Sequence, residues 1–157
     1  MKFLVTKELW YNPLLKWLVV LLVVILSFFL LSDMLLHHYQ IGLEFSKAIE
    51  TIMGNEEEFT DPILFDALLE RVHIDIFTST VTLMLLAIIY VRVAPQSRIK
   101  SLPIHLSFVT AILSHVALMG GFYAGEFLIQ LWIVLFVIWH IIALGLSLYI
   151  IGRLVFK

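Results

Sequence analysis

Four stretches of this chain are apolar over lengths that a water-soluble fold of its size does not bury. A helix needs about 20 residues to cross the roughly 30 Å hydrocarbon core of a bilayer. Hydrophobic residues make up 62% of the chain and charged residues only 14%, a composition that does not suit a soluble domain. The sequence therefore predicts an all-α integral membrane protein with transmembrane helices at about 13–36, 62–95, 103–121 and 126–152.

Capping and breaking residues set the ends of these helices. Asn12-Pro13 and Asp61-Pro62 each combine a capping side chain with a proline that suits the first helical position. Pro103 opens the third helix, Gly120-Gly121 is expected to close it, and Gly152 is expected to close the fourth. The connections after the second and third helices are short, so consecutive helices should be antiparallel neighbours. We expect one up-down four-helix bundle over residues 1–157.

The longest connection, about residues 37–61, is predicted to lie outside the membrane. Within it, residues 43–53 place Phe45, Ile49 and Met53 on one face of a helix. An amphipathic helix of this kind is typical of the membrane interface. We therefore expect a short helical segment between the first two spans.

The positions of the basic residues predict the orientation. Cytoplasmic segments carry an excess of Lys and Arg, and eight of the ten basic residues fall on one side of the predicted topology: Lys2, Lys7, Lys16, Arg92, Arg98, Lys100, Arg153 and Lys157. The first apolar run has no small-x-small cleavage site after it, which favours an uncleaved span. These patterns predict cytoplasmic amino and carboxyl termini in the inner (plasma) membrane of a bacterium.

Composition and missing motifs exclude several classes of function. The net charge of −2 gives no indication of nucleic-acid binding. The absence of cysteine excludes disulfides, thiolate metal sites and iron–sulfur clusters, and leaves His, Asp, Glu and Met as the main ligands. The chain also has no Gly-x-Ser-x-Gly, no His-Glu-x-x-His and no phosphate-binding glycine loop. Soluble hydrolase chemistry is therefore not indicated.

Two histidines are predicted to lie near the middle of the membrane. His115 and His140 lie about 12 and 13 residues into the third and fourth helices, which enter from opposite sides. Neutral imidazoles on adjacent helices could provide the two axial nitrogens of a haem b. The alternative is that each histidine hydrogen-bonds a neighbouring helix and only fixes packing. His105 lies on a different face from His115, which argues against a second haem on that helix.

A second group of candidate ligands is expected at the outer end of the bundle. Asp33 and His37 are four residues apart, and Asp66, Glu70 and His73 share one face of the second helix. With His38, these residues could ligate iron, zinc or copper, or His73 could ligate a haem together with His37 or His38. The metal-site hypothesis comprises His37, His38, Asp66, Glu70 and His73. The alternative is a set of solvated interfacial side chains.

The second helix carries two polar stripes, of which one should face the bundle interior. The first stripe is Asp75, Ser79 and Thr82, and the second is His73 and Thr80. A hydroxyl stripe below a carboxylate could begin a proton path. The alternative is hydrogen bonding between helices.

Three functions are compatible with these features. The first is a small cytochrome b-like protein or cytochrome subunit that passes electrons from quinol through a His-ligated haem, and its layout resembles four-helix membrane cytochromes b. The second is a non-catalytic accessory or assembly subunit that packs against other membrane subunits or against copies of itself. The third is a proton or metal-ion transporter, which requires a continuous polar route.

Overall fold

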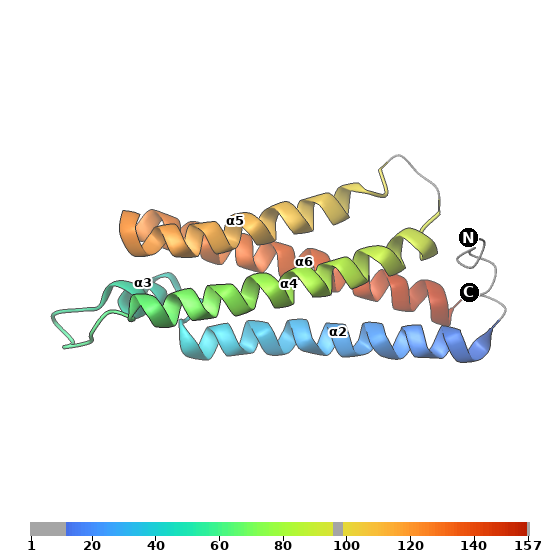
Figure 1. The fold of residues 1–157 in the computed structure, drawn as a ribbon, viewed down its shortest axis with the longest axis horizontal. Coiled ribbons are helices and arrows are strands. Elements are labelled where there is room, and N and C mark those ends of the chain that lie inside the picture. The colour runs from blue at the N-terminus through green and yellow to red at the C-terminus, as the bar shows by residue number, and fades with distance from the viewer. Residues whose placement is uncertain (1–11, 96–98, 157) are drawn as a thin grey trace.

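The computed structural model describes residues 12–95 and 99–156, and these residues form a bundle of helices (Figure 1). Its helices are α2 (Pro13–Gln40), α3 (Phe45–Met53), α4 (Phe65–Val93), α5 (Leu102–Ala124) and α6 (Glu126–Val155). The described residues contain no strand, and their only β-type pairing is an isolated bridge between Asn55 and Thr60. The predicted all-α four-helix architecture is confirmed.

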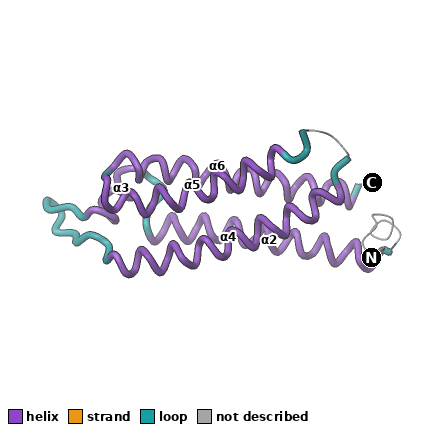
Figure 2. Tube along the Cα trace, turned by 45° about the horizontal axis from the view of Figure 1, so that its top comes forward, coloured by secondary structure: helices purple, strands orange, loops and turns teal. Residues whose placement is uncertain are grey.

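The four long helices run side by side in alternating directions, and the irregular segments lie at the two ends of the bundle (Figure 2). Each of these helices is long and apolar enough to cross a membrane. The short helix α3 lies at one end, where α2 and α5 finish and α4 and α6 begin, and we call this the α3 end. Lys2, Lys7, Arg98 and Lys157, which contributed to the predicted orientation, lie outside the described residues.

Two helix starts show how local sequence sets the bundle. At α2 the predicted cap is present, because the Leu15 amide donates to Asn12 Oδ1 over 3.2 Å. At α4 the helix begins at Phe65, three residues after the proline that was expected to start it. The Ile63 amide instead donates to the Thr51 carbonyl over 3.1 Å, which holds this segment against α3. A tertiary hydrogen bond therefore delays the helix that the Asp-Pro pair signals.

The glycines of α5 act in packing rather than as a helix end. Helix α5 continues through Gly120 and Gly121 to Ala124, and the turn into α6 is made by Gly125, whose φ is +93°. A Cβ atom on Gly121 would lie 2.7 Å from Ile129 Cγ1. The two glycines thus allow α5 and α6 to approach closely, as small residues do in membrane bundles. The turn requires glycine because side-chain-bearing residues rarely adopt that φ.

Helix α3 covers the end of the bundle with one of its faces. Ala48 and Ile52 are buried, whereas Phe45 and Met53 are exposed. The exposed pair belongs to the face that the sequence predicted for the membrane interface. Helix α3 therefore has one protein-facing side and one apolar side available to lipid.

Polarity in the bundle is partly inverted relative to a soluble protein. Large apolar side chains such as Phe28, Phe77 and Leu148 are exposed on the outer surface, as lipid contact requires. The interior instead contains buried polar side chains on all four long helices: His37, Ser79, Thr82, Ser107, Thr110, Ser114, His115, His140 and Ser147. Polar groups buried in a membrane protein need partners or a function, so these residues define where a site can be.

Candidate functional site

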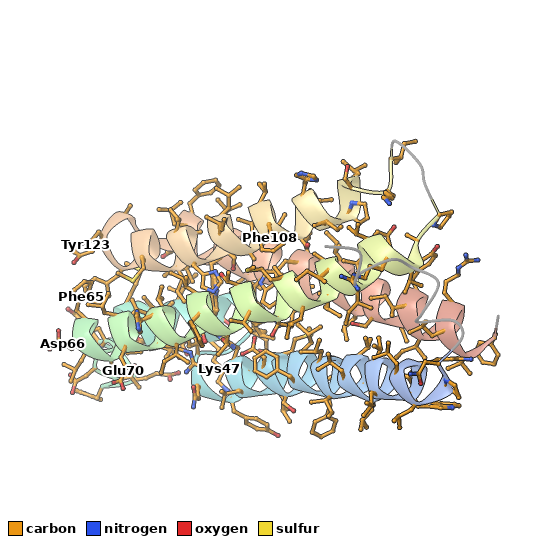
Figure 3. All side chains as sticks on the ribbon, turned by 45° about the vertical axis from the view of Figure 1, so that its right-hand side comes forward. Lys47, Phe65, Asp66, Glu70, Phe108 and Tyr123 are labelled. Carbon is orange, nitrogen blue, oxygen red and sulfur yellow. The ribbon has the colours of Figure 1, made fainter. Side chains whose placement is uncertain are left out.

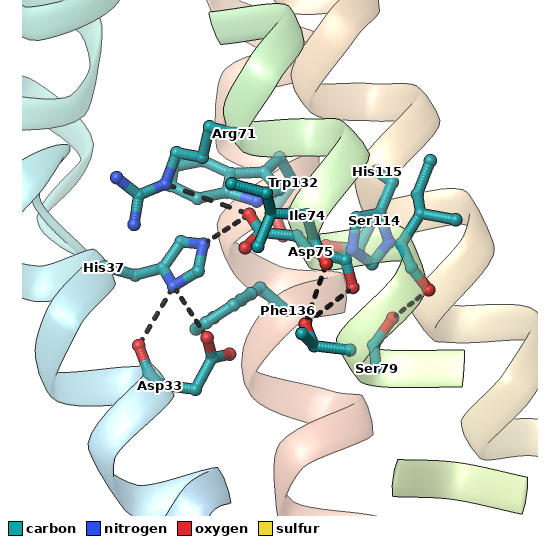
Figure 4. A network of polar contacts seen from close by, with 12 residues as sticks. Asp33, His37, Arg71, Ile74, Asp75, Ser79, Ser114, His115, Trp132 and Phe136 are labelled. Carbon is teal, nitrogen blue, oxygen red and sulfur yellow. Dashed lines mark hydrogen bonds and ion pairs between the residues drawn. The ribbon is translucent and has the colours of Figure 1, made fainter. Parts of the chain in front are cut away.

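A chain of histidines and aspartates crosses the interior between three helices. Helix α2 contributes Asp33 and His37, α4 contributes Asp75, and α6 contributes His140. We call these four residues the His–Asp chain. His37 and His140 are 1% and 0% exposed, so both lie in the bundle core. Three helices that are distant in sequence therefore meet at one buried polar cluster. Figure 4 shows Asp33, His37 and Asp75 of this cluster beside Trp132 and Phe136 of α6.

The contacts alternate between imidazole and carboxylate. His37 Nε2 lies 2.9 Å from Asp75 Oδ2, and His140 Nε2 lies 3.0 Å from Asp33 Oδ2. His37 Nδ1 is also 3.5 Å from Asp33 Oδ1, which joins the two pairs. The order along the chain is Asp75, His37, Asp33, His140. Each titratable group is thus in contact with the next.

Backbone carbonyls fix the orientation of both imidazoles. His37 Nδ1 lies 2.9 Å from the Asp33 carbonyl oxygen, and His140 Nδ1 lies 2.8 Å from the Phe136 carbonyl oxygen. A carbonyl only accepts, so each Nδ1 carries a proton and donates it. Each Nε2 then faces a carboxylate oxygen, and a hydrogen bond there requires one more proton. That proton belongs either to the imidazole or to the carboxylic acid.

Arg71 places a positive charge beside the His–Asp chain, because its Nε lies 3.8 Å from Asp75 Oδ2. With a proton in both Nε2–carboxylate contacts, each imidazole–carboxylate pair is neutral overall. The five side chains together then carry the single charge of Arg71.

Aromatic side chains of α6 pack around the His–Asp chain. The Phe136 ring lies between the two imidazoles, with centroids 4.5 Å from His37 and 4.2 Å from His140. Trp139 packs on His140 at 3.6 Å between ring centroids. Trp132 and Phe136 lie four residues apart on one helix face, and His140 follows after another four. These rings exclude water, which strengthens the electrostatic contacts inside.

A pocket on the bundle surface reaches Asp75, at one end of the His–Asp chain. It has a volume of about 360 Å³ and is lined by α2 and α4 residues that include Gln40, Glu70, Arg71 and Asp75. Glu70 and Gln40 are exposed, so the pocket has a polar rim near the α3 end. Asp75 is therefore the member of the His–Asp chain that lines this pocket, and His140 is the most buried member.

The interior stripe of α4 is the one that contains the carboxylate. Ser79 and Thr82 are buried, and the side chain of Asp75 is only 13% exposed. His73 and Thr80 of the other stripe are exposed. The expectation that one stripe faces inward agrees with the structure, and that stripe leads from the His–Asp chain toward the opposite end of the bundle.

The predicted metal ligands are divided between two environments. His37 is buried, but its carboxylate partners are Asp33 and Asp75 rather than Asp66 and Glu70. The latter two lie exposed on the first turns of α4 (Figure 3). His73 is also exposed, and His38 is half-buried with its ring 5.5 Å from that of Tyr39. Among the described residues, no hydrogen bond or ion pair joins His37 to Asp66, Glu70 or His73.

The two predicted haem ligands face different parts of the bundle. His140 has both ring nitrogens in hydrogen-bond contact, one with Phe136 and one with Asp33 of α2. His115 hydrogen-bonds the Ala111 carbonyl through Nδ1 and lines a groove formed by α4 and α5. His140 is not among the residues that line this groove. Bis-histidine haem ligation stays a prediction, and it would require His140 to leave Asp33.

Sequence reasoning missed the pairing of His140 with Asp33 and the role of Arg71. The available signal was the four-residue spacing of Asp33 and His37, together with Asp75 at the head of a polar stripe. Both features mark inward faces. Neither shows that α6 is rotated so that His140 meets α2.

Comparison with known proteins gives one family match. The chain matches a family model named Aq_1264_TM and described as a transmembrane helical domain, over residues 42–157. Comparisons with curated proteins and with solved structures give no significant match. The matched segment covers α3 to α6, and the four long apolar helices agree with the description. The chain is therefore a multi-pass integral membrane protein that belongs to the Aq_1264_TM family of transmembrane helical domains.

Proposed function

We propose that the protein moves protons through the membrane along the His–Asp chain. The observation that carries this proposal is the unbroken series of contacts from Asp75, at a polar surface pocket, to His140 in the core. In the orientation that the basic residues predict, protons enter from outside through the pocket. Two steps pass a proton between an imidazole Nε2 and a carboxylate oxygen in hydrogen-bond contact, at His37–Asp75 and at His140–Asp33. The step between them runs from His37 Nδ1 to Asp33 Oδ1, which lie 3.5 Å apart.

The other half of the bundle offers hydroxyl groups for the continuation of the route. Ser147 of α6 is fully buried seven residues beyond His140, and Thr82 of α4 is buried beyond Ser79. On α5, Ser107 and Thr110 are buried near the opposite end. A hydroxyl can accept one proton and donate another, so these groups can relay a proton together with water. They carry no charge, which limits the desolvation cost.

The test is proton flux into vesicles that contain the purified protein. A potassium diffusion potential drives protons inward, and a trapped pH-sensitive dye reports the rate. We expect Asp33→Asn to lower the protein-dependent rate about tenfold or more, because an amide cannot take up a proton in this pH range. Asn keeps the shape of the side chain and offers an amide N–H to Nε2 of the neutral His140, so the fold should be retained.

The matched control replaces a carboxylate that does not belong to the His–Asp chain. Asp66 lies exposed on the first turn of α4 and has no place in the cluster. Asp66→Asn should conduct at the rate of the unaltered protein. A rate no higher than that of protein-free vesicles, or an Asp33→Asn rate equal to that of Asp66→Asn, would refute proton transport by this route.

The second candidate function is metal binding, which the close approach of three side chains favours. Asp33, His37 and Asp75 each offer one ligand atom, and these atoms lie within 4.8 Å of one another. The Nδ1–H bond of His37 to a backbone carbonyl leaves Nε2 as the ligand nitrogen, which is how metal-binding imidazoles are usually oriented. Zinc or ferrous iron suits one imidazole and two carboxylates. Arg71 beside Asp75 opposes the added positive charge.

Metal analysis separates this candidate from proton transfer. Protein equilibrated with zinc and then freed of unbound ion should retain about one zinc per chain if the three residues bind it. Asp75→Asn should lose the ion, while Asp66→Asn should keep it. Absence of retained zinc, or equal retention in both variants, would exclude the metal site.

A further inference from the structure

A groove between α4 and α5 forms a second site, apart from the His–Asp chain. It has a volume of about 460 Å³, within the roughly 300–1,000 Å³ typical of small-molecule sites. On α5 its lining extends from Phe108 to Tyr123, which corresponds to about 22 Å of helix (Figure 3). On α4 it extends from Val72 to Leu83. No member of the His–Asp chain lines the groove.

The floor and the rim of the groove differ in exposure. The floor contains buried small and apolar side chains, among them Ala111 and Leu83. The rim contains Ile112 and Val116, whose side chains are 60% and 63% exposed. In a membrane-spanning helix these exposed apolar side chains face lipid. The groove therefore opens toward the acyl chains, and a lipid-soluble molecule can enter it from the side.

His115 is the polar group at the floor of the groove. It is 8% exposed, and its only hydrogen bond within the described part of the chain runs from Nδ1 to the Ala111 carbonyl. Since Nδ1 donates, the neutral ring presents Nε2 as an acceptor. An acceptor that faces a groove at this depth has no bulk water to bond with, and leaving it without a partner is costly. The ligand that satisfies it must donate a hydrogen bond, so its polar group is a hydroxyl rather than a carbonyl.

The depth of His115 in the membrane further restricts the class of ligand. His115 lies 13 residues after the start of α5 and nine before its end, which places it near the middle of the span. A charged or zwitterionic headgroup cannot reach that depth without a large cost. A neutral aromatic head with an apolar tail can, and Phe108 and Tyr123 line the two ends of the groove, where their rings can contact other parts of the ligand.

We infer that this groove binds a lipid-soluble quinol, with one phenolic hydroxyl donating to His115 Nε2. The apolar tail would lie along the α4–α5 groove toward the lipid. The inference rests on the cavity, on the acceptor and on its depth, none of which involves the proton route.

The experiment measures equilibrium binding of three probes to the detergent-solubilised protein by ultrafiltration: a decyl-tailed benzoquinol kept reduced, its quinone, and its dimethyl ether. The quinol should bind saturably at about one per chain. The ether and the quinone, which lack the donor, should bind about tenfold more weakly. His115→Leu should lower quinol affinity about tenfold and remove the discrimination between probes.

Two further variants test the groove itself. Val116→Trp places a large ring in the groove and should abolish saturable binding. Val109→Trp is the matched control, because Val109 is an exposed valine of the same helix that does not line the groove. Non-saturable partition of the quinol, equal affinity for the ether, or unchanged binding by His115→Leu or Val116→Trp would overturn the inference.

Discussion

Replacing Asp33 with leucine is expected to lower the free energy of unfolding by about 3–5 kcal/mol, the usual cost of removing one partner from a buried charged pair. Asp33 lies at the junction of the His–Asp chain, because its two carboxylate oxygens face His140 and His37. Leucine removes the acceptor of His140 Nε2, and His140 is completely buried. Equilibrium unfolding in mixed micelles with increasing dodecyl sulfate, followed by helical circular dichroism, measures the change.

Two control variants show whether the loss of stability comes from the buried contacts of Asp33. Asp33→Asn provides an amide N–H that donates to Nε2 of the neutral His140, so its cost should be about 1 kcal/mol. Glu58→Leu changes an exposed carboxylate of the loop between α3 and α4, and its effect should stay within about 0.5 kcal/mol. If Asp33→Leu costs no more than Glu58→Leu, the chain of contacts does not stabilise the fold.

Replacing Gly121 with leucine is expected to destabilise the bundle by about 1–3 kcal/mol or to separate α5 from α6. A Cβ at this position would lie 2.7 Å from Ile129 Cγ1 and 3.3 Å from the Ile129 backbone nitrogen. The side-chain atom can turn away, but the backbone atom cannot move without displacing α6. The same unfolding assay measures the loss, and cysteine cross-linking between the two helices reports their separation.

The chain provides a matched control for Gly121. Gly152 is also helical, and a Cβ there would meet nothing within 4 Å. Gly152→Leu should therefore change the free energy of unfolding by less than about 0.5 kcal/mol. In a double-mutant cycle, Ile129→Ala should reduce the cost of Gly121→Leu, because it removes the atom closest to the new side chain. Equal costs at both glycines would show that the close approach of α5 and α6 is not required.

The helices of this protein could be predicted because their signals are local. The length of each apolar stretch and the cap at Asn12 depend only on neighbouring residues, and the structure has helices at all four predicted spans. The boundaries that differ do so through tertiary contacts. The Thr51 carbonyl binds the segment before α4, and α5 continues through Gly121, where the missing side chain allows the close approach of Ile129.

The candidate site could be predicted only in part, because it depends on helix rotation. The sequence identified His37, His115 and His140 as histidines that require an explanation, and it placed Asp75 on an inward stripe. It could not show which partner each would meet.

The lengths of the apolar stretches by themselves determined that the chain spans a bilayer with four helices. Each helix satisfies its own backbone hydrogen bonds, so each can lie in lipid without help from the others. Only the tertiary structure decided that His140 meets Asp33, a residue 107 positions earlier in the chain. That pairing depends on the rotation and register of α2 against α6, and these are set by side-chain packing among all the helices at once.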